Sequence, residues 1–334
     1  MTTTKFDLRY MTNVGFSSDQ GGRAFQKPSC IVRRSDGRIF IGSRGPAADQ
    51  TVGIQMVSLD HDFFGVIGKL GRGEGQMMEP SALALDAEDN LYLADEKLHK
   101  ISVFSPDGKF IKWWGQQGTG PGQFEGPCGL LIQGDILFVV DARNHRVQKL
   151  SKDGAYMGEW GSFGTDNGAF RFPWGITDDQ DGNIFIADWG NDRIQKLTPD
   201  GQHLETYGTS GSGEGELSRP ADVAVDPDGN LYIADWGNQR LQVIDSNGTF
   251  LAASRGEAVE HNPWVVEYFQ GVLDEKAARD TFVPIFEVDI QDEHEISARI
   301  EPYFWDPCSV ILDEQNRVYV LETCRHRFQV FERI

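Results

Sequence analysis

Several features that mark common protein classes are missing from this sequence. The apolar runs, such as Ile136–Val140, are far too short to span a bilayer. The first fourteen residues, MTTTKFDLRYMTNV, contain no apolar signal core and no small-residue cleavage site, so no secretory leader is expected. The cysteines include no CxxC pair and favour reduced thiols over a disulfide framework; they are Cys30, Cys128, Cys308 and Cys324. These absences predict a cytoplasmic protein without a membrane anchor.

Basic residues are also scarce. The chain has 31 Lys and Arg against 51 Asp and Glu, a formal net charge of −20. Such a charge repels phosphate backbones, which argues against nucleic acid and anionic membranes as partners. It also keeps a protein in solution without any specific role. With 39% hydrophobic residues and 38 glycines, the composition is that of a turn-rich globular chain rather than a disordered one.

An internal repeat dominates the sequence. A proline followed by a β-rich run recurs at intervals of 46 to 52 residues, with one longer interval of 87, at Pro28, Pro80, Pro127, Pro173, Pro220 and Pro307. An acidic residue that ends a short apolar run keeps step with it, at Asp95, Asp141, Asp188, Asp235 and Glu322. Two markers in phase indicate a repeat architecture.

One unit shows what the repeat encodes. Strands are expected at 173–176, 184–188, 194–197 and 203–207, each short and rich in β-forming residues. Asp-Gly and Gly-Asn pairs between them supply the turns that antiparallel connections need. Four strands in about 45 residues make one blade of a β-propeller.

The loop Asp188-x-x-Asn191-x-Arg193 recurs in the units on either side of it, and this pattern resembles the NHL repeat. The resemblance covers essentially the whole chain apart from one insertion, although unit 2 has Leu98 and Lys100 in the Asn and Arg places. It implies an all-β, six-bladed propeller of the NHL type formed by residues 1–334. In that family the Asp, Asn and Arg residues mostly tie strands and neighbouring blades together.

The last unit lacks a fourth strand, because the chain ends shortly after 328–331. Residues 5–10, followed by Gly15, resemble the fourth strand of other units. We therefore predict that the N-terminal strand closes the ring and removes exposed sheet edges.

The long interval before Pro307 predicts a helix-containing insertion at 256–302, between blades 5 and 6. Asn262 can cap a helix with Pro263 at its first position, and apolar residues follow at helical spacing as far as Ala277. A β-like stretch, 283–290, and an acidic run, 289–295, come next. The helix either packs on the propeller or serves as a lid or docking element.

First-strand residues just after the marker prolines should line the mouth of the central channel. They include Cys128, Trp174 and Cys308, and Asp222 stands one position further along in its own unit. A related branch of propellers, the peptidyl-hydroxyglycine amidating lyases, binds zinc with histidines in this region. No histidine stands directly after these prolines in this sequence, which argues against that activity. Cys128, Cys308 and Cys324 are weak candidates for a divalent metal, with buried, inert thiols as the alternative. The glycine runs, such as 71–75, do not lead from a strand into a helix, so no nucleotide cofactor is expected.

Aromatic and basic residues gather in the loops of the same face. The candidates for ligand binding are Trp174, Trp189, Trp236, Trp305, Asp222, Arg143, Arg325 and Arg327. Inter-blade packing is the alternative role for these side chains. The function expected is therefore a scaffold that recognises a protein, peptide or small ligand on this Trp/Arg-lined face. A lyase or hydrolase with a metal-assisted site at the channel mouth, using Asp222, Cys128 or Cys308, is the alternative. An RNA reader, which the resemblance to animal NHL proteins suggests, conflicts with the net charge.

Overall fold

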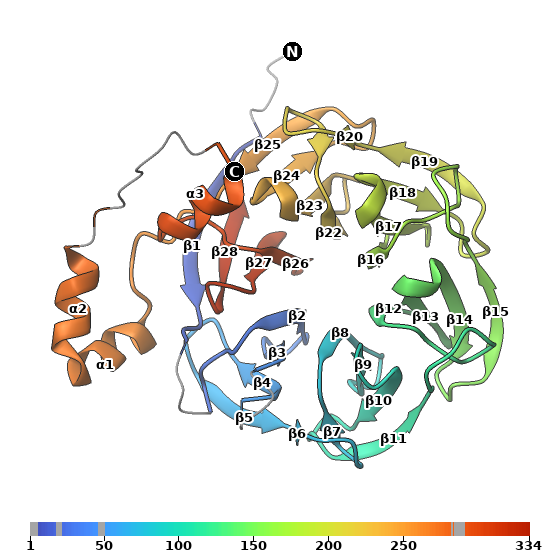
Figure 1. The fold of residues 1–334 in the computed structure, drawn as a ribbon, viewed down its shortest axis with the longest axis horizontal. Helices are drawn as coiled ribbons and strands as arrows, with labels where there is room; N and C mark the ends of the chain where they lie inside the picture. The colour runs from blue at the N-terminus through green and yellow to red at the C-terminus, as the bar shows by residue number, and fades with distance from the viewer. Residues whose placement is uncertain (1–5, 18–21, 46–50, 282, 284–290) are drawn as a thin grey trace.

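Six four-stranded antiparallel sheets surround a central channel in the computed structural model (Figure 1). It describes residues 6–17, 22–45, 51–281, 283 and 291–334. Each sheet is one blade, and in blades 1–5 the strands run outward from the channel in chain order. The predicted six-bladed, all-β propeller is confirmed.

The strands of the first three blades follow the repeat. Blade 1 contains β2 (Pro28–Arg33), β3 (Ile39–Ser43), β4 (Gly53–Val57) and β5 (Phe63–Ile67). Blade 2 contains β8 (Pro80–Leu85), β9 (Leu91–Asp95), β10 (Lys100–Phe104) and β11 (Phe110–Trp114). Blade 3 contains β12 (Pro127–Gln133), β13 (Ile136–Asp141), β14 (Arg146–Ser151) and β15 (Tyr156–Trp160).

The remaining blades repeat this order. Blade 4 contains β16 (Pro173–Asp178), β17 (Ile184–Asp188), β18 (Arg193–Leu197) and β19 (His203–Tyr207). Blade 5 contains β22 (Pro220–Val225), β23 (Leu231–Asp235), β24 (Arg240–Ile244) and β25 (Phe250–Ser254). Blade 6 contains β26 (Pro307–Leu312), β27 (Arg317–Glu322) and β28 (Arg327–Arg333), with β1 (Leu8–Val14) as its outermost strand.

Second strands form the core between blades. All five residues of β17 are buried, as are those of β9 and β23, because both faces of each strand pack against a neighbouring blade. Such strands read as continuous apolar runs instead of alternating ones. Fourth strands are more exposed, and in β11 half-buried and exposed residues alternate, because the outer face of the blade meets solvent. The core is therefore a ring of apolar layers between blades rather than one central cluster.

The two ends of the chain close the ring. β1 pairs antiparallel with β28, from Leu8 opposite Arg333 to Val14 opposite Phe328. Asp7 and Ile334 exchange backbone hydrogen bonds beyond the strand ends. The predicted closure by the N-terminal strand is confirmed, and it pairs an edge that blade 6 would otherwise expose.

The glycine runs lie in the crossings from one blade to the next. Two crossings contain short parallel pairs, β6 (Lys69–Leu70) with β7 (Gln76–Met77) and β20 (Thr209–Ser210) with β21 (Glu216–Leu217). Gly71 has a φ of +147°, and the side chain of Gln76 lies where its Cβ would stand. These positions need glycine for backbone reasons, which accounts for the runs without any phosphate-binding role.

Three helices form the insertion between β25 and β26: α1 (Pro263–Gly271), α2 (Leu273–Asp280) and α3 (Glu293–Arg299). Asn262 caps α1 by accepting from the backbone N–H groups of Trp264 and Val265. The predicted helix is thus present but breaks at Val272, after Gly271, where the backbone is no longer helical. Apart from Val283, the predicted β-like stretch lies outside the described residues.

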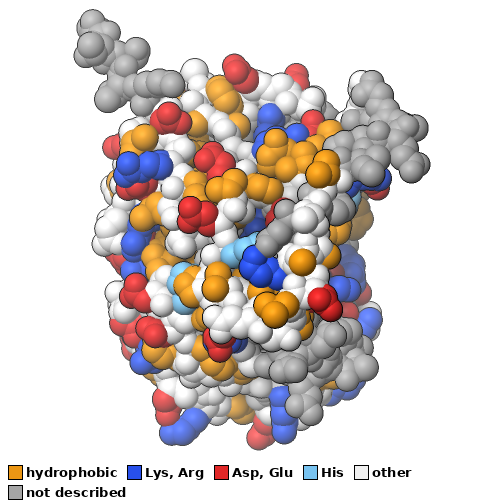
Figure 2. Space-filling model, turned by 90° about the vertical axis from the view of Figure 1, so that its left-hand side faces the viewer, with side chains coloured by type: hydrophobic (Ala, Val, Ile, Leu, Met, Phe, Trp, Pro, Cys, Tyr) orange, Lys and Arg blue, Asp and Glu red, His pale blue; other side chains and the backbone are white. Residues whose placement is uncertain are grey.

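The insertion packs on the side of the propeller at α1 (Figure 1). The Trp264 indole is buried against Phe16, Phe25 and His61, and its Nε1–H donates to the carbonyl of His61 at 2.8 Å. Figure 2 shows this side of the molecule, where hydrophobic and charged side chains are interspersed. Within the described ranges, no helix is long and apolar enough to cross a membrane.

Candidate functional site

The repeated Asp, Asn and Arg residues hold each blade together. In blade 4, Asp188 is fully buried, and its Oδ2 accepts from Asn191 Nδ2 at 2.9 Å and Arg193 Nε at 2.8 Å. Its Oδ1 accepts the backbone N–H of Arg171, in the crossing from the previous blade, at 2.8 Å. Asp141 and Asp235 make the equivalent bonds in their blades. These side chains, which recur at the same repeat position, are therefore internal ties and are not available to a ligand.

A second set of bonds links neighbouring blades at the loop face, which is the face formed by the blade crossings and the loops between second and third strands. In five seams, the residue before the marker proline donates its N–H to a side chain of the preceding blade. The acceptors are Nδ1 of His99, His145 and His326 (3.1–3.2 Å), Oδ1 of Asp192 (2.7 Å) and Oε1 of Gln239 (2.8 Å). The three histidines are thus half-buried acceptors in the seams.

The central channel holds a cavity of about 440 Å³ lined by the first strands of all six blades. The post-proline residues lie in its wall, where Ser29 and Ser81 each donate to the next blade's proline carbonyl at 2.6 Å. Cys128 and Cys308 make the same link through sulfur, at 3.4 and 3.7 Å. Trp174 lines the cavity and packs against the core between blades 3 and 4. The predicted lining is present, and most of its polar groups already bond to protein.

Two carboxyls line the cavity, Asp178 and Asp222, and Asp222 is the one next to a post-proline position. Its Oδ2 accepts from Ser309 Oγ at 2.7 Å and from the Val310 N–H at 3.0 Å, which ties blade 5 to blade 6. Burial raises its pKa to about 6, although these hydrogen bonds oppose the shift. A carboxyl that titrates near neutrality can exchange protons, so Asp222 is the strongest acid–base candidate in the channel.

The cysteines do not assemble into a metal site. Burial raises the pKa of Cys30, Cys308 and Cys324 to about 12 and that of Cys128 well above its usual range. Cys324 Sγ lies 3.1 Å from Asp306 Oδ2, away from the channel lining. In the part of the chain that the structure describes, no three His, Cys, Asp or Glu side chains come together as metal ligands. The residues present therefore do not fit a closed metal site.

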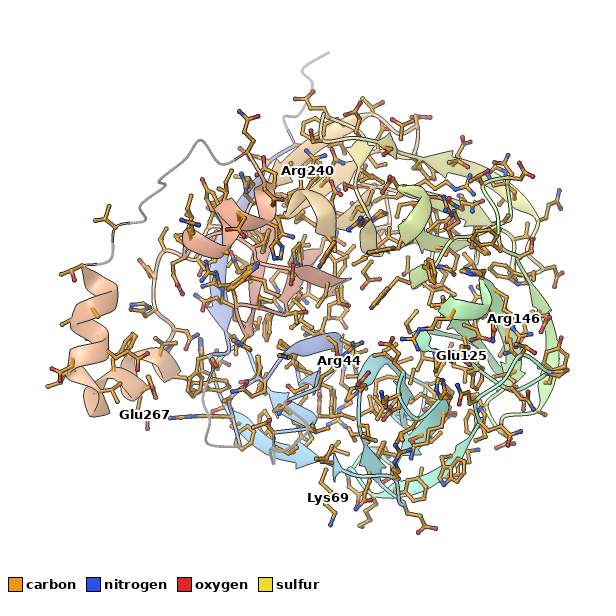
Figure 3. The ribbon with its side chains drawn as sticks, in the orientation of Figure 1. Arg44, Lys69, Glu125, Arg146, Arg240 and Glu267 are labelled. Atoms are coloured by element: carbon orange, nitrogen blue, oxygen red, sulfur yellow. The ribbon has the colours of Figure 1, made fainter. Side chains whose placement is uncertain are left out.

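An ion network at the channel mouth was not anticipated. Glu96 bridges Arg44 of blade 1 (3.1 Å) and Arg143 of blade 3 (2.6 Å). Arg44 Nε also donates to the carbonyl of Pro80 at 3.0 Å. Figure 3 shows Arg44 near the central opening, in contrast to Lys69 at the outer rim. Arg44 stands in the irregular loop of unit 1, where the repeat pattern gives no register, so the sequence could not place it.

Aromatic residues form a strip across the loop face in blades 4 to 6. Trp189 lies in the short helical turn η2 (Trp189–Asn191) and Trp236 in η3 (Trp236–Asn238), with ring centroids 6.2 Å apart. His294 of α3 continues the strip, 6.2 Å from Trp236 and 6.1 Å from Trp305. The Trp305 Nε1–H donates to His294 Nε2 at 3.2 Å, which leaves the proton on Nδ1, 3.1 Å from Asp306 Oδ1.

Helix α3 covers the blade 6 end of this strip. The Arg325 guanidinium donates to the carbonyls of Ser297 and Ala298 and lies over the Trp305 ring at 5.3 Å. Arg327 is buried, pairs with Glu322 at 2.9 Å and donates to Glu301, as the repeat arginines do in other blades. Trp236, Trp305 and Arg325 thus contact the chain's own insertion, and Arg327 lies inside the blade rather than on the face.

The blade 3–5 end of the strip is open, and we call it the open half: Phe163, Arg171, Phe172, Trp189 and Arg219. Phe163 and Phe172 are 63% and 45% exposed, and both pack on the ring of His145. Arg171 lies over Phe163 at 5.6 Å, and Arg219 over Trp189 at 5.1 Å. Trp189 was a candidate from its place in the Asp-x-x-Asn-x-Arg loop, whereas the other four residues stand in crossings outside that loop and gave no sequence signal.

The fold and this face define a six-bladed β-propeller with an elaborated loop face. The sequence model of the NHL repeat matches residues 170–197 and 217–244. The chain is therefore a six-bladed β-propeller that contains NHL repeats, which the sequence model matches in blades 4 and 5.

One sequence relative and two solved structures illustrate what the chain is similar to. Over 72 residues the chain is 33% identical to Protein brain tumor of Drosophila melanogaster, a match that spans 21% of this chain and 7% of that protein. The structure of virginiamycin B lyase from Staphylococcus aureus is similar at 14% identity, with a TM-score of 0.56, over 99% of this chain and 100% of that one. A Bacteroides thetaiotaomicron protein of unknown function aligns at 16% identity, TM-score 0.62, over 99% and 77%. At these identities the two structures show a shared fold alone.

Proposed function

We propose that this protein is a binding scaffold that recognises a partner protein on the open half of its loop face. The observation that carries the proposal is the pair of aromatic and arginine stacks there, which contact solvent while the equivalent residues of blade 6 are covered by α3. Exposed Trp, Phe and Arg side chains are enriched at the energetic centres of protein interfaces.

The way α3 binds supports a polypeptide partner. This segment of the same chain lies on Trp236 through His294 and presents backbone carbonyls to Arg325. A partner segment on Trp189 would meet the same combination of one aromatic ring and one stacked arginine, since Arg219 lies over that ring. The face therefore already accommodates a peptide at one end and offers like chemistry at the other.

The alternative of a lyase or hydrolase at the channel rests on Asp222. Its carboxyl is held by Ser309 and Val310, which gives it a structural role between blades. The thiols that would accompany it are protonated at neutral pH, because burial raises their pKa values. The binding scaffold is the function that the geometry supports better.

The experiment compares capture of cell proteins by immobilised wild type and two variants, followed by direct binding of the isolated partner. Trp189→Ala removes the ring under Arg219, whereas Trp113→Ala removes a tryptophan that is 51% exposed on β11, away from the open half. We expect Trp189→Ala to weaken binding about tenfold or more and Trp113→Ala to leave it unchanged. Equal binding by both variants, or loss of the partner with Trp113→Ala alone, would contradict the proposal.

A further inference from the structure

The cations of the open half differ from the other arginines of the molecule. Arg143, Arg193 and Arg325 are each engaged by a carboxylate or by backbone carbonyls. Among the residues that the structure describes, Arg171 and Arg219 have no ion pair and no hydrogen bond from the guanidinium. Both are exposed, so their N–H groups face solvent.

The two arginines are brought to one place by η2. The N–H of Gly190 donates to the carbonyl of Arg171 at 2.7 Å, which puts that residue directly beside the turn. Arg219 lies over the ring of Trp189, the first residue of the same turn. Asp192, which follows the turn, is occupied: its carboxylate accepts from the Arg219 N–H and from Ser210 Oγ. Each of its oxygens thus accepts one hydrogen bond, and in the part of the chain that the structure describes it makes no ion pair with either guanidinium.

A guanidinium that lies on an aromatic ring keeps a fixed plane and presents its N–H groups at the edge, which suits bidentate binding of a carboxylate. We infer that the open half binds an acidic peptide segment of the partner, in which carboxylate side chains flank an apolar or aromatic residue. The carboxylates bind Arg171 and Arg219, and the apolar residue packs on Trp189 and Phe172. This inference rests on the proposed function and names the chemistry of its partner.

The net charge of −20 does not oppose such contact. At physiological salt, charges farther than about 8 Å are largely screened, for a peptide as for a nucleic acid, so the attraction depends on Arg171 and Arg219 together with the Asp192 carboxylate beside them. A nucleic acid could also stack on these rings, but its backbone requires a longer basic track, and two unpaired arginines on a strongly acidic protein do not provide one. The inference therefore favours a peptide over RNA.

The probe is an array of labelled decapeptides, each with two Glu or Asp residues beside one Phe, Trp or Leu, together with the same peptides carrying Gln or Asn. Wild-type protein should bind acidic peptides, with affinity falling as salt rises, and should bind the amide forms about tenfold or more weakly. The double variant Arg171→Gln/Arg219→Gln should lose that preference. The matched control is Arg38→Gln, because Arg38 also lies over an exposed ring, that of Phe64 at 5.0 Å, on another blade.

Four outcomes overturn the inference. Equal binding of acidic and amide peptides, or unchanged binding by the double variant, excludes carboxylate recognition. In either case the proposed function survives if Trp189→Ala still weakens binding of the partner protein. Absence of any bound peptide, with no effect of Trp189→Ala on the captured partner, removes both. Binding of a single-stranded RNA oligonucleotide that depends on Arg171 and Arg219, without acidic peptide binding, assigns the surface to nucleic acid instead.

Discussion

Replacing Asp188 by Asn tests whether the repeated acidic residue is a structural tie. The substitution keeps the shape of the side chain, but one carboxylate oxygen becomes an amide N–H₂ that faces donors. Oδ2 now accepts from Asn191, Arg193 and Gln195, and Oδ1 accepts from the Arg171 N–H, so either amide orientation opposes a donor to a donor. The Arg193 guanidinium, largely buried, also loses its counter-charge.

The size of the effect follows from burial. Removing one partner of a buried ion pair costs about 3–5 kcal/mol of unfolding free energy. An unfolding entropy of about 2.1 cal/mol/K per residue gives roughly 0.7 kcal/mol/K for 334 residues. The melting temperature should therefore fall by about 4–7 °C.

Differential scanning calorimetry and urea unfolding would measure this change. The control is Asp181→Asn, which removes the same charge from an exposed turn of the same blade. We expect the control to melt with the wild type. A fall of less than about 1 °C for Asp188→Asn would refute the claim that these aspartates hold the blades together, because so small a change is the size expected of a surface substitution.

Four further predictions concern the ring, the seams and the insertion. Deleting residues 1–12 removes most of β1, so unfolding should lose cooperativity in calorimetry, and an unchanged melt would contradict closure by this strand. The pKa of Asp222 is about 6 in the folded protein against a reference of 3.8, so its contribution to stability is complete below pH 3.8 and is lost as pH rises through 6. Asp222→Asn should therefore flatten the curve of stability against pH over this range. Burial, with Lys27 and Arg325, lowers the pKa of His326 from 6.5 to about 4, so the contribution of this histidine to stability is present above pH 6.5 and lost as pH falls through 4. His326→Gln keeps an acceptor, as Gln239 does in blade 5, and should reduce this loss of stability in acid. An acid unfolding profile identical to that of the wild type would contradict this prediction. Trp264→Ala should cost about 3–5 kcal/mol if α1 stays packed and should increase proteolysis within the insertion, whereas an unaltered digest would show that α1 does not depend on this anchor.

The sequence was sufficient to predict the blades because their determinants are local and repeated. Strand propensity, Asp-Gly turns and the marker prolines recur in register, and six copies average out the ambiguity of any single one. The closure by an N-terminal strand was also predictable, since a missing fourth strand at one end matched an extra strand at the other; the strand was expected at 5–10 and runs over Leu8–Val14. The helix break at Val272 was not, because apolar spacing continues across it and only the backbone shows the interruption.

The loop face was decided by tertiary structure. Arg327 and Arg325 stand two residues apart in one loop, yet the first is buried in the blade and the second clamps α3, since the repeat register sends one inward and the insertion meets the other. Arg171 and Arg219 gave no signal in the sequence, because their importance comes from lying beside the turn η2 and from guanidinium groups that make no ion pair within the described residues. The sequence by itself determined the propeller, its number of blades and its closure, through local and periodic interactions. Which cations remain unpaired, and which tryptophans are covered by α3, depends on contacts between segments distant in the chain, and only the folded structure could decide it.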